Sequence, residues 1–298
     1  MVNLFFLKTF VDAAKTGSFR SAAFKNFVTQ PAVTQHIRLL EKKVGCQLFE
    51  RQNKKIVLTP SGSAFLLHAE NILKQYEEAK MQVAEINKQF FGTIRIATIY
   101  SIGLYELKPI IRNYLKQFPK VDIHLEYHSF NKIYEMVSNR TIDFGFVAFP
   151  QKRQSIVLEV FAEEDLILAQ SKNQPIFKKA EISLKDLGEA RFVAFTINAP
   201  TRQAIDHFLH GKKIYPNVVN EYDNIETLKS AIELGIGCSI IPKNTITQEI
   251  KNRVFDIPRV RGLTLTRPLG IIYPKGKVFS ATTRAFYDMA INSEHYKA

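Results

Sequence analysis

The stretch from Thr29 to Gly45, TQPAVTQHIRLLEKKVG, constrains the fold more than any other part of this chain. Thr29 can cap a helix N-terminus, Pro31 suits the first turn, and Gly45 suits the position just past a helix end. Between these signals, apolar residues recur at spacings of four, three and four, which puts them on one face: Val33, Ile37, Leu40 and Val44. The sequence therefore predicts an amphipathic helix with one packed face and one free face.

The free face of this helix is polar and cationic, with Thr34, Gln35, Arg38, Lys42 and Lys43. Glutamine can pair with a base edge in the DNA major groove, and arginine or lysine can hold phosphates. Residues 1–60 contain ten Lys or Arg and three Asp or Glu, a balance of +7 within a net charge of +13 for the whole chain. Because basic amphipathic helices are often plain solvated surface, the interpretation depends on the neighbouring segments.

Two further helices and a hairpin are predicted around this stretch. Apolar spacing predicts helices over residues 4–15 and 18–27, and alanines in the second allow a close helix crossing. After Gly45, the short alternating runs 47–51 and 55–58 predict a hairpin with a basic tip. This order is typical of a helix-turn-helix followed by a wing.

The motifs GSFRSAA (17–23), TQPAVTQHIRLLEKKVGCQLFER (29–51) and VLTPSG (57–62) follow one another in the first part of the chain. In this order they closely resemble the winged helix-turn-helix of LysR-type transcriptional regulators. The resemblance implies a DNA-binding domain over residues 1–58, whose DNA-binding residues are Gln30, Pro31, Ala32, Thr34, Gln35, Arg38, Arg51 and Lys54. Alternatives stay open, since Pro31 can serve only to start the helix, Ala32 only to pack, and Lys54 only as a surface charge.

A long helix is predicted over residues 59–91, because a start signal at Thr59-Pro60 is followed by no Pro or Gly from residue 63 until Gly92. Its apolar residues alternate spacings of four and three, the heptad pattern of a coiled coil. In the resembling family this is the linker helix that pairs two DNA-binding heads; the alternative is a long helix lying on its own domain. The expected dimerisation residues are Phe65, Ala69, Ile72, Tyr76, Ala79, Val83 and Ile86.

From Gly92 onward, short β-rich runs alternate with helical ones. This βα order predicts an α/β fold with parallel sheets and a ligand crevice at the carboxyl edges of the strands. The predicted strands are 93–99, 121–127, 143–149, 165–169, 191–195, 218–222 and 238–241, and the predicted helices are 105–118, 131–139, 201–209, 224–234 and 244–250. The last segments, 264–273 and 278–292, should return to complete the first lobe.

Three motifs of this part, in residues 98–111, 141–148 and 226–242, match landmarks of the LysR-type effector-binding domain. That domain is a two-lobed module similar to periplasmic solute-binding proteins. The resemblance implies an effector domain over residues 92–298, with lobe I at about 92–161 and 264–298 and lobe II at about 162–263.

Three strand-to-helix turns in this domain carry small hydroxyl residues. Backbone N–H groups at helix starts bind anions, and hydroxyls add directional donors. The sequence therefore predicts a small anionic effector between the lobes, held by Ser101, Ile102, Ser129, Thr196 and Thr201, with Arg202 as countercharge. The alternative is that these hydroxyls are ordinary helix caps.

Catalytic and membrane-spanning patterns are missing from the sequence. The seven histidines are scattered, and no phosphate-binding glycine loop or nucleophile elbow is present, so we expect no enzyme, no metal and no cofactor. Cys46 and Cys238 are far apart, and we expect Cys238 to be a buried strand thiol rather than an oxidant sensor. With no run near the ~18 apolar residues of a membrane span, we expect a cytoplasmic protein without membrane contact.

Together these features predict a LysR-type regulator that binds a pseudo-palindromic promoter site in double-stranded DNA under the control of a small effector. The resemblance implies a homodimer that assembles into a homotetramer, and RNA polymerase is an expected partner. One alternative is a solute-binding protein that uses only the two-lobed part, against which the first 91 residues argue. The other is a nucleoid protein that binds DNA without sequence preference.

Overall fold

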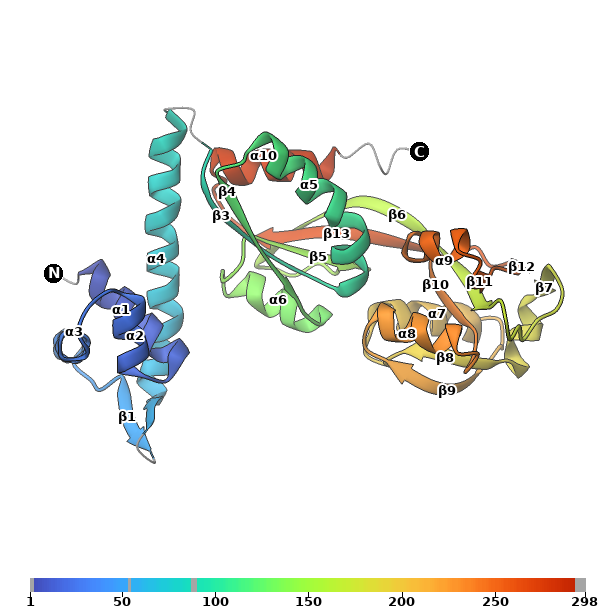
Figure 1. Ribbon diagram of the computed structural model, residues 1–298, viewed down its shortest axis with the longest axis horizontal. Coiled ribbons are helices and arrows are strands. Elements are labelled where there is room, and N and C mark those ends of the chain that lie inside the picture. The colour runs from blue at the N-terminus through green and yellow to red at the C-terminus, as the bar shows by residue number, and fades with distance from the viewer. Residues whose placement is uncertain (1–2, 53–54, 87–89, 293–298) are drawn as a thin grey trace. The chain divides into compact units, whose positions relative to one another are not determined.

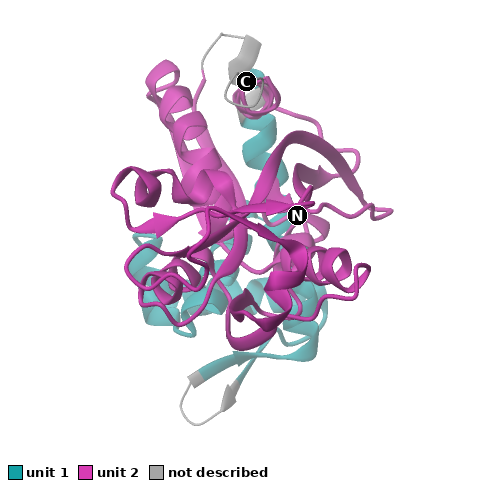
Figure 2. Ribbon diagram, turned by 90° about the vertical axis from the view of Figure 1, so that its right-hand side faces the viewer, with its two compact units in different colours: residues 1–89 teal, residues 90–298 magenta. Residues whose placement is uncertain are grey.

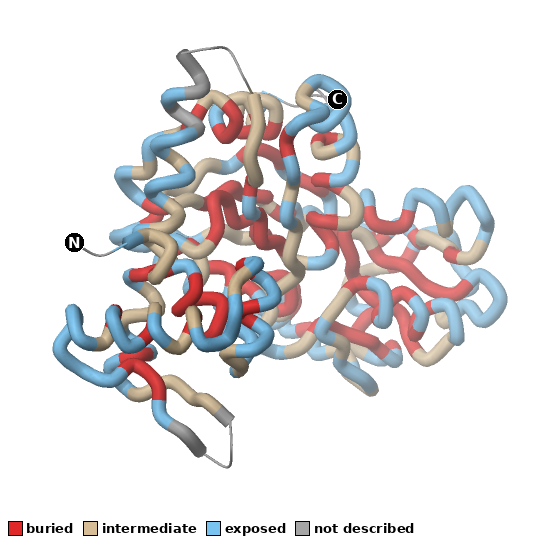
Figure 3. Tube along the Cα trace, turned by 60° about the vertical axis from the view of Figure 1, so that its left-hand side comes forward, coloured by how far each residue is buried: buried red, intermediate tan, exposed pale blue. Residues whose placement is uncertain are grey.

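The computed structural model describes residues 3–52, 55–86 and 90–292, and the chain divides into two compact units, residues 1–89 and 90–298 (Figure 2). Figure 3 shows buried segments gathered inside each unit. In the described part of the chain, no helix is both long and apolar enough to span a membrane.

The first unit is a helical head with a two-stranded wing (Figure 1). Its elements are α1 (Leu4–Thr16), α2 (Phe19–Lys25), α3 (Gln30–Val44), β1 (Phe49–Gln52), β2 (Lys55–Leu58) and α4 (Pro60–Ile86). The predicted helix-turn-helix is confirmed, although α2 ends at Lys25, two residues before the predicted end. The following turn contains Phe27, whose backbone is left-handed with φ of 55° and whose side chain is 96% exposed.

The ends of α3 form as its capping residues predict. The Thr29 side chain accepts a hydrogen bond from the Ala32 N–H at 3.4 Å, and Gly45 adopts the left-handed conformation with φ of 84°. Val33, Ile37 and Leu40 are buried, but Val44 is 37% exposed, so the predicted buried stripe ends one turn early. Val44 is the last residue of α3, next to its C-cap Gly45.

The start of the wing is held to α3 by a side-chain carboxylate and lies against α4 at a close backbone approach. Glu41 on α3 accepts hydrogen bonds from the N–H groups of Leu48 and Phe49, at 2.8 and 3.3 Å. A Cβ atom on Gly62 would lie 2.0 Å from the Leu48 carbonyl oxygen, so only glycine permits this approach of α4 to the wing. These contacts give the head one continuous core from α1 to α4.

The second unit contains two lobes joined by strands. In lobe I lie β3 (Gly92–Thr98), η1 (Ile102–Glu106), α5 (Leu107–Gln117), β4 (Val121–Tyr127), α6 (Phe130–Ser138), β5 (Phe144–Ala148) and α10 (Ala281–Ile291). In lobe II lie β7 (Glu181–Ser183), η2 (Leu184–Glu189), β8 (Arg191–Phe195), α7 (Pro200–His210), β9 (Asn217–Tyr222), α8 (Ile225–Glu233), β10 (Ser239–Pro242), η3 (Lys243–Ile246), α9 (Thr247–Lys251), β11 (Phe255–Asp256) and β12 (Arg259–Arg261). Two long strands, β6 (Ile156–Ser171) and β13 (Thr266–Pro274), run between the lobes (Figure 1).

The strand directions are only partly as predicted. β3 pairs parallel with β4 and β5, and β8 pairs parallel with β9. The connecting strands differ, since β13 is antiparallel to β5 and β6, and β10 is antiparallel to β6. The expectation of purely parallel sheets is therefore wrong, because a strand that returns from the far lobe enters the sheet from the opposite end.

Strand β6 is far longer than the predicted run 165–169, since it begins at Ile156. Glu159, Glu163 and Glu164 interrupt the apolar pattern before the predicted run. Along the strand, Phe161 and Ala162 pack in a core of lobe I, whereas Leu166 and Leu168 pack in a core of lobe II. The crossing between the lobes therefore falls in the few residues between Ala162 and Leu166.

Candidate functional site

The free face of α3 carries most of the residues predicted to lie at DNA. Gln30, Pro31, Gln35 and Arg38 are exposed, and with Thr34 they line one shallow depression. Ala32 and Thr34 are half-buried, and the Thr34 hydroxyl donates to the Gln30 carbonyl at 3.1 Å. The wing residue Lys54 and the side chain of Arg51 lie outside the described residues.

The predicted dimerisation residues on α4 fall into two groups, one packed in the head and one exposed. Ala69 is fully buried and Phe65 packs beside it in the core of the head, so these two side chains face their own domain and not a partner helix. Further along, Ile72 is 43% exposed, Tyr76 47% and Val83 64%, and Ala79 is also exposed. The Ile86 side chain lies outside the described residues, and the exposed seam is therefore Ile72, Tyr76, Ala79 and Val83.

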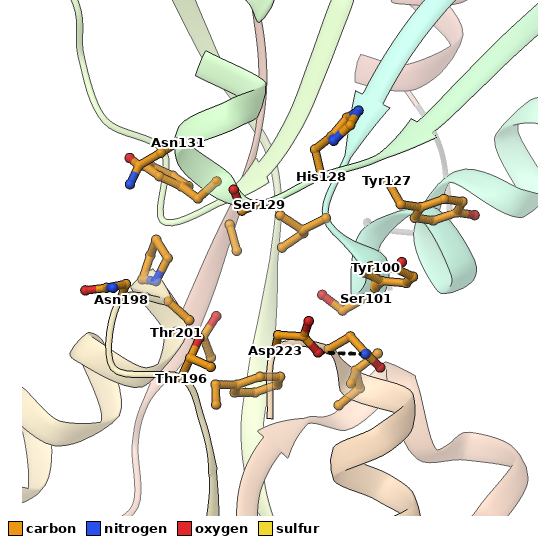
Figure 4. A pocket seen from close by; sticks show the side chains of 18 of the residues that line it. Tyr100, Ser101, Tyr127, His128, Ser129, Asn131, Thr196, Asn198, Thr201 and Asp223 are labelled. Atoms are coloured by element: carbon orange, nitrogen blue, oxygen red, sulfur yellow. Dashed lines mark hydrogen bonds between the residues drawn. The ribbon is translucent and has the colours of Figure 1, made fainter. Parts of the chain in front are cut away.

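A cavity of about 530 Å³ separates the two lobes of the second unit. Ser101 and Ser129 of lobe I and Thr196 and Thr201 of lobe II line it, and Figure 4 shows their side chains around a common space. The sequence therefore placed these four hydroxyls correctly at one cavity. The other lining residues are Ile99, Tyr100, Tyr127, His128, Phe130, Asn131, Ala148, Phe195, Asn198, Ala199, Pro200, Asp223, Asn224, Ile225 and Arg267.

Two helices begin at this cavity without a side-chain cap. Ser129 precedes α6 and Ala199 precedes α7, and in neither case does a described side chain accept from the first-turn N–H groups. Helix α8 differs, because Asn224 accepts from the N–H groups of Glu226 and Thr227 at 3.1 and 3.0 Å. The first turns of α6 and α7 thus offer free donors and positive dipole ends from opposite lobes.

Arg267 supplies the buried cation of the cavity. Its side chain is 1% exposed; Nη2 donates to Glu164 Oε2 at 2.6 Å and Nη1 donates to Ser101 Oγ at 3.1 Å. Its Nε has no acceptor among the described residues. Burial, together with the nearby charges of Glu106 and Asp165, raises the pKa of Glu164, although Arg267 opposes this shift.

Two residues of the predicted effector site are misplaced. Ile102 is fully buried in the core of lobe I, and Arg202 does not line the cavity. The Arg202 guanidinium is occupied by Asp206 at 2.7 Å, and by Glu221 and the Phe195 carbonyl at 2.8 Å each. The arginine that lines the cavity is instead Arg267, which sequence reasoning missed. The sequence did contain a signal. Arg267 stands in an apolar segment, and an arginine is almost never buried in such a place unless it pairs with another group.

The lobes are also linked beside the cavity through Lys229, a buried residue of α8. Its Nζ donates to Glu249 at 2.7 Å, to the Thr245 carbonyl at 3.1 Å and to the hydroxyl of Tyr105 from lobe I. The Tyr105 hydroxyl donates in turn to Glu226 at 2.6 Å, and burial together with this bond raises the pKa of Tyr105 to about 12. This network joins η1 of lobe I to α8 of lobe II.

Comparison with known proteins identifies both units. The LysR substrate binding domain matches residues 87–293, and the bacterial regulatory helix-turn-helix of the lysR family matches residues 4–63. The chain belongs to the LysR family. It is therefore a DNA-binding transcriptional regulator with a helix-turn-helix head and an effector-binding domain.

Relatives of this LysR-family chain align over most of its length. The HTH-type transcriptional activator CmpR of Synechocystis sp. is 30% identical over 281 residues, covering 94% of this chain and 92% of CmpR. The HTH-type transcriptional regulator CysL of Bacillus subtilis is 26% identical, with coverage of 90% and 89%. The crystal structure of full-length CbnR complexed with its target DNA has the same fold, with a TM-score of 0.72 at 24% identity over 97% of this chain and 98% of CbnR.

The cysteines of this LysR-family chain lie in contrasting surroundings. Cys46 is exposed just after α3, whereas Cys238 is fully buried and bridges to the strand that contains Phe192. Burial raises the pKa of the Cys238 thiol to about 12. The expectation of a buried strand thiol at Cys238 is confirmed, and such a thiol forms little of the reactive thiolate near neutral pH.

Proposed function

We propose that this regulator binds a pseudo-palindromic promoter site as a dimer built on α4, and that a small molecule with an anionic group in the lobe cavity controls its hold on DNA. The observation that carries the proposal is the combination, in one chain, of an exposed polar face on α3 and a cavity lined by Arg267 and two uncapped helix starts. The first can read DNA and the second can hold an anion.

The DNA-reading part of the proposal rests on the chemistry of α3. Gln35 lies on the exposed face with the amide geometry that pairs with adenine, and Arg38, one turn later, suits a phosphate. Gln30, Pro31, Ala32 and Thr34 form the N-terminal end of this face, where recognition helices approach base edges. Arg51 and Lys54 remain the proposed contacts of the wing.

The assembly part rests on the exposed seam of α4. Apolar residues at heptad spacing on a helix that is otherwise polar favour a partner helix with the same pattern. A second copy of this chain supplies that helix, which gives two heads for the two halves of a site. Further association into a homotetramer, contact with RNA polymerase and action in the cytoplasm complete the proposal.

Control by the effector follows from the two-lobed domain. A ligand shifts a conformational equilibrium only when it binds the two arrangements with different affinity. A molecule that contacts Ser101 and Ser129 of lobe I together with Thr196 and Thr201 of lobe II binds best when the lobes are at one particular separation. We propose that this preference passes through the dimer to the spacing of the heads.

The test is to sequence the genomic fragments that the purified protein retains, followed by footprinting of the enriched site at increasing salt. The proposal expects protection of one two-fold symmetric site that persists in excess bulk DNA. Uniform retention of all fragments, with only the steep salt dependence of phosphate contacts, would identify a nucleoid protein and overturn the proposal.

A further inference from the structure

We propose that the effector is a small zwitterion of the amino-acid class, whose carboxylate lies at Arg267 and the starts of α6 and α7 and whose ammonium group faces Asp223. The inference rests on the proposed function and deepens it by naming the chemical class of the ligand. It is drawn from the donors, charges and volume of the lobe cavity.

The anion-binding half of the cavity combines two independent features. Helices α6 and α7, of 9 and 11 residues, begin at its wall with first-turn N–H groups that no described side chain caps. Arg267 lines the same cavity, is 1% exposed, and has an Nε–H without an acceptor in the described part of the chain. Glu164 and Ser101 hold this guanidinium at the cavity wall, where its positive charge favours a carboxylate bound beside Ser101.

Asp223 places a negative charge among the residues that line the cavity. It lies in the turn between β9 and α8, its side chain is exposed, and Figure 4 shows it with Ser101 and Thr196 around the cavity. Asn224 Nδ2 donates to Asp223 Oδ1 at 2.9 Å, and no other described donor reaches the carboxylate. The aspartate can therefore accept a hydrogen bond from an ammonium group.

The charge balance of the cavity favours a zwitterion over a dianion. Glu164 already neutralises Arg267 at 2.6 Å, so Asp223 leaves an excess of negative charge among these three groups. The two helix starts contribute about half a positive charge each, which brings the site close to neutral. Inorganic sulfate or a phosphate monoester would add about two negative charges to this near-neutral site, whereas a zwitterion keeps the balance.

The remaining walls set the size and character of the ligand. Tyr100 and Tyr127 stack with ring centroids 5.0 Å apart, and Phe130 and Phe195 add apolar surface. A cavity of about 530 Å³ suits a small metabolite, and aromatic faces attract both an ammonium group and an apolar side chain. These features fit an amino acid better than an inorganic ion.

The experiment is calorimetric titration of the full chain with the standard amino acids, with the des-amino carboxylate of any amino acid that binds, and with sulfate and phosphate. We expect at least one amino acid to bind, and its des-amino analogue to bind at least about tenfold more weakly, because a charge-assisted hydrogen bond is lost. Asp223→Asn should weaken the amino acid by about tenfold and leave the des-amino carboxylate unchanged or tighter. Asp122→Asn, at an exposed position of β4 away from the cavity, is the matched control and should change neither.

Three results would overturn the zwitterion proposal: no amino acid binds, sulfate or phosphate binds at least as tightly as any amino acid, or Asp223→Asn and Asp122→Asn behave alike. The regulator proposal is judged separately, by the selective retention of genomic DNA without added ligand. If the protein retains one symmetric DNA site but binds an inorganic anion at least as tightly as any amino acid, the zwitterion proposal is wrong and the regulator proposal is supported.

Discussion

Arg267 on β13 and Glu164 on β6 are register partners in neighbouring antiparallel strands, and Nη2 of the arginine lies 2.6 Å from Oε2 of the glutamate. Both strands pass between the lobes at this point, and both side chains are almost fully buried. The ion pair therefore joins the two connecting strands beside the lobe cavity, which Arg267 lines.

Removing one partner of this pair should destabilise the two-lobed unit strongly. Glu164→Ala leaves the buried Arg267 without its counter-ion, and we expect a loss of about 3–5 kcal/mol in the free energy of unfolding. Urea unfolding followed by near-ultraviolet circular dichroism measures it. Glu163→Ala, at the exposed neighbouring position, is the control and should stay within about 0.5 kcal/mol of the parent. Equal losses from both variants would contradict the role assigned to the pair.

Two substitutions on the exposed face of α3 should have different effects on DNA binding. Gln35→Ala should relax preference at one base position, at a cost of about 1–3 kcal/mol on the preferred sequence and little on others. Arg38→Ala should weaken binding on all sequences and reduce the salt slope by about one phosphate contact. Fluorescence anisotropy on matched and scrambled duplexes separates the two. If Gln35→Ala weakened every duplex equally, Gln35 would belong with the phosphate contacts.

A charge introduced into the exposed seam of α4 should weaken dimerisation. Ile72→Lys and Val83→Lys each put a like charge on both copies within an apolar interface, so we expect the dimer dissociation constant to rise at least about tenfold. Sedimentation equilibrium measures the change. Glu77→Lys introduces the same side chain at a 61% exposed position outside the seam, and it should leave the dimer intact. An unchanged dimer in both seam variants would mean that assembly uses another surface.

The two thiols should react at very different rates. Cys46 is exposed and should react with Ellman's reagent in a fast phase near pH 8. Cys238 is buried, its pKa is raised to about 12, and it should stay protected until the chain unfolds. Cys46→Ser should abolish the fast phase, and Cys238→Ser should preserve it. Rapid labelling of Cys238 in the folded protein would restore oxidant sensing as a role for this residue.

The Tyr105 hydroxyl should hold the lobes together. Tyr105→Phe removes its bonds to Glu226 and to Lys229, and because Lys229 is buried we expect a loss of about 1–3 kcal/mol in stability of the two-lobed unit. Urea unfolding tests this, with Tyr215→Phe, 63% exposed, as the control. A loss no larger than that of the control would show that the remaining partners of Lys229 suffice.

Local signals in the sequence were enough to predict the head. Thr29 and Gly45 cap α3 as expected, and Val33, Ile37 and Leu40 are buried as their spacing requires. Helix caps and periodicity act over a few residues, so they can be recognised without knowledge of the fold. The same reasoning located the strand-to-helix turns that contribute Ser101, Ser129, Thr196 and Thr201 to the cavity.

The division of the α4 seam depended on tertiary packing. Heptad spacing continues unchanged from Phe65 to Val83, yet Ala69 contacts the core of its own head and Val83 is 64% exposed. Periodicity shows which residues share a face of a helix, but it carries no information about where the neighbouring domain ends. Only the packed head separates the two groups.

The sequence by itself determined the fold class, helix α3 and the hydroxyls near the helix starts, because each depends on residues close together in the chain. The tertiary structure alone decided which arginine serves the cavity. Arg202 lies beside the predicted turn but is occupied by Asp206 and Glu221, whereas Arg267 comes from a distant strand to meet Ser101 and Glu164. Charge pairing is settled by distances in space, and the strands that cross between the lobes set those distances.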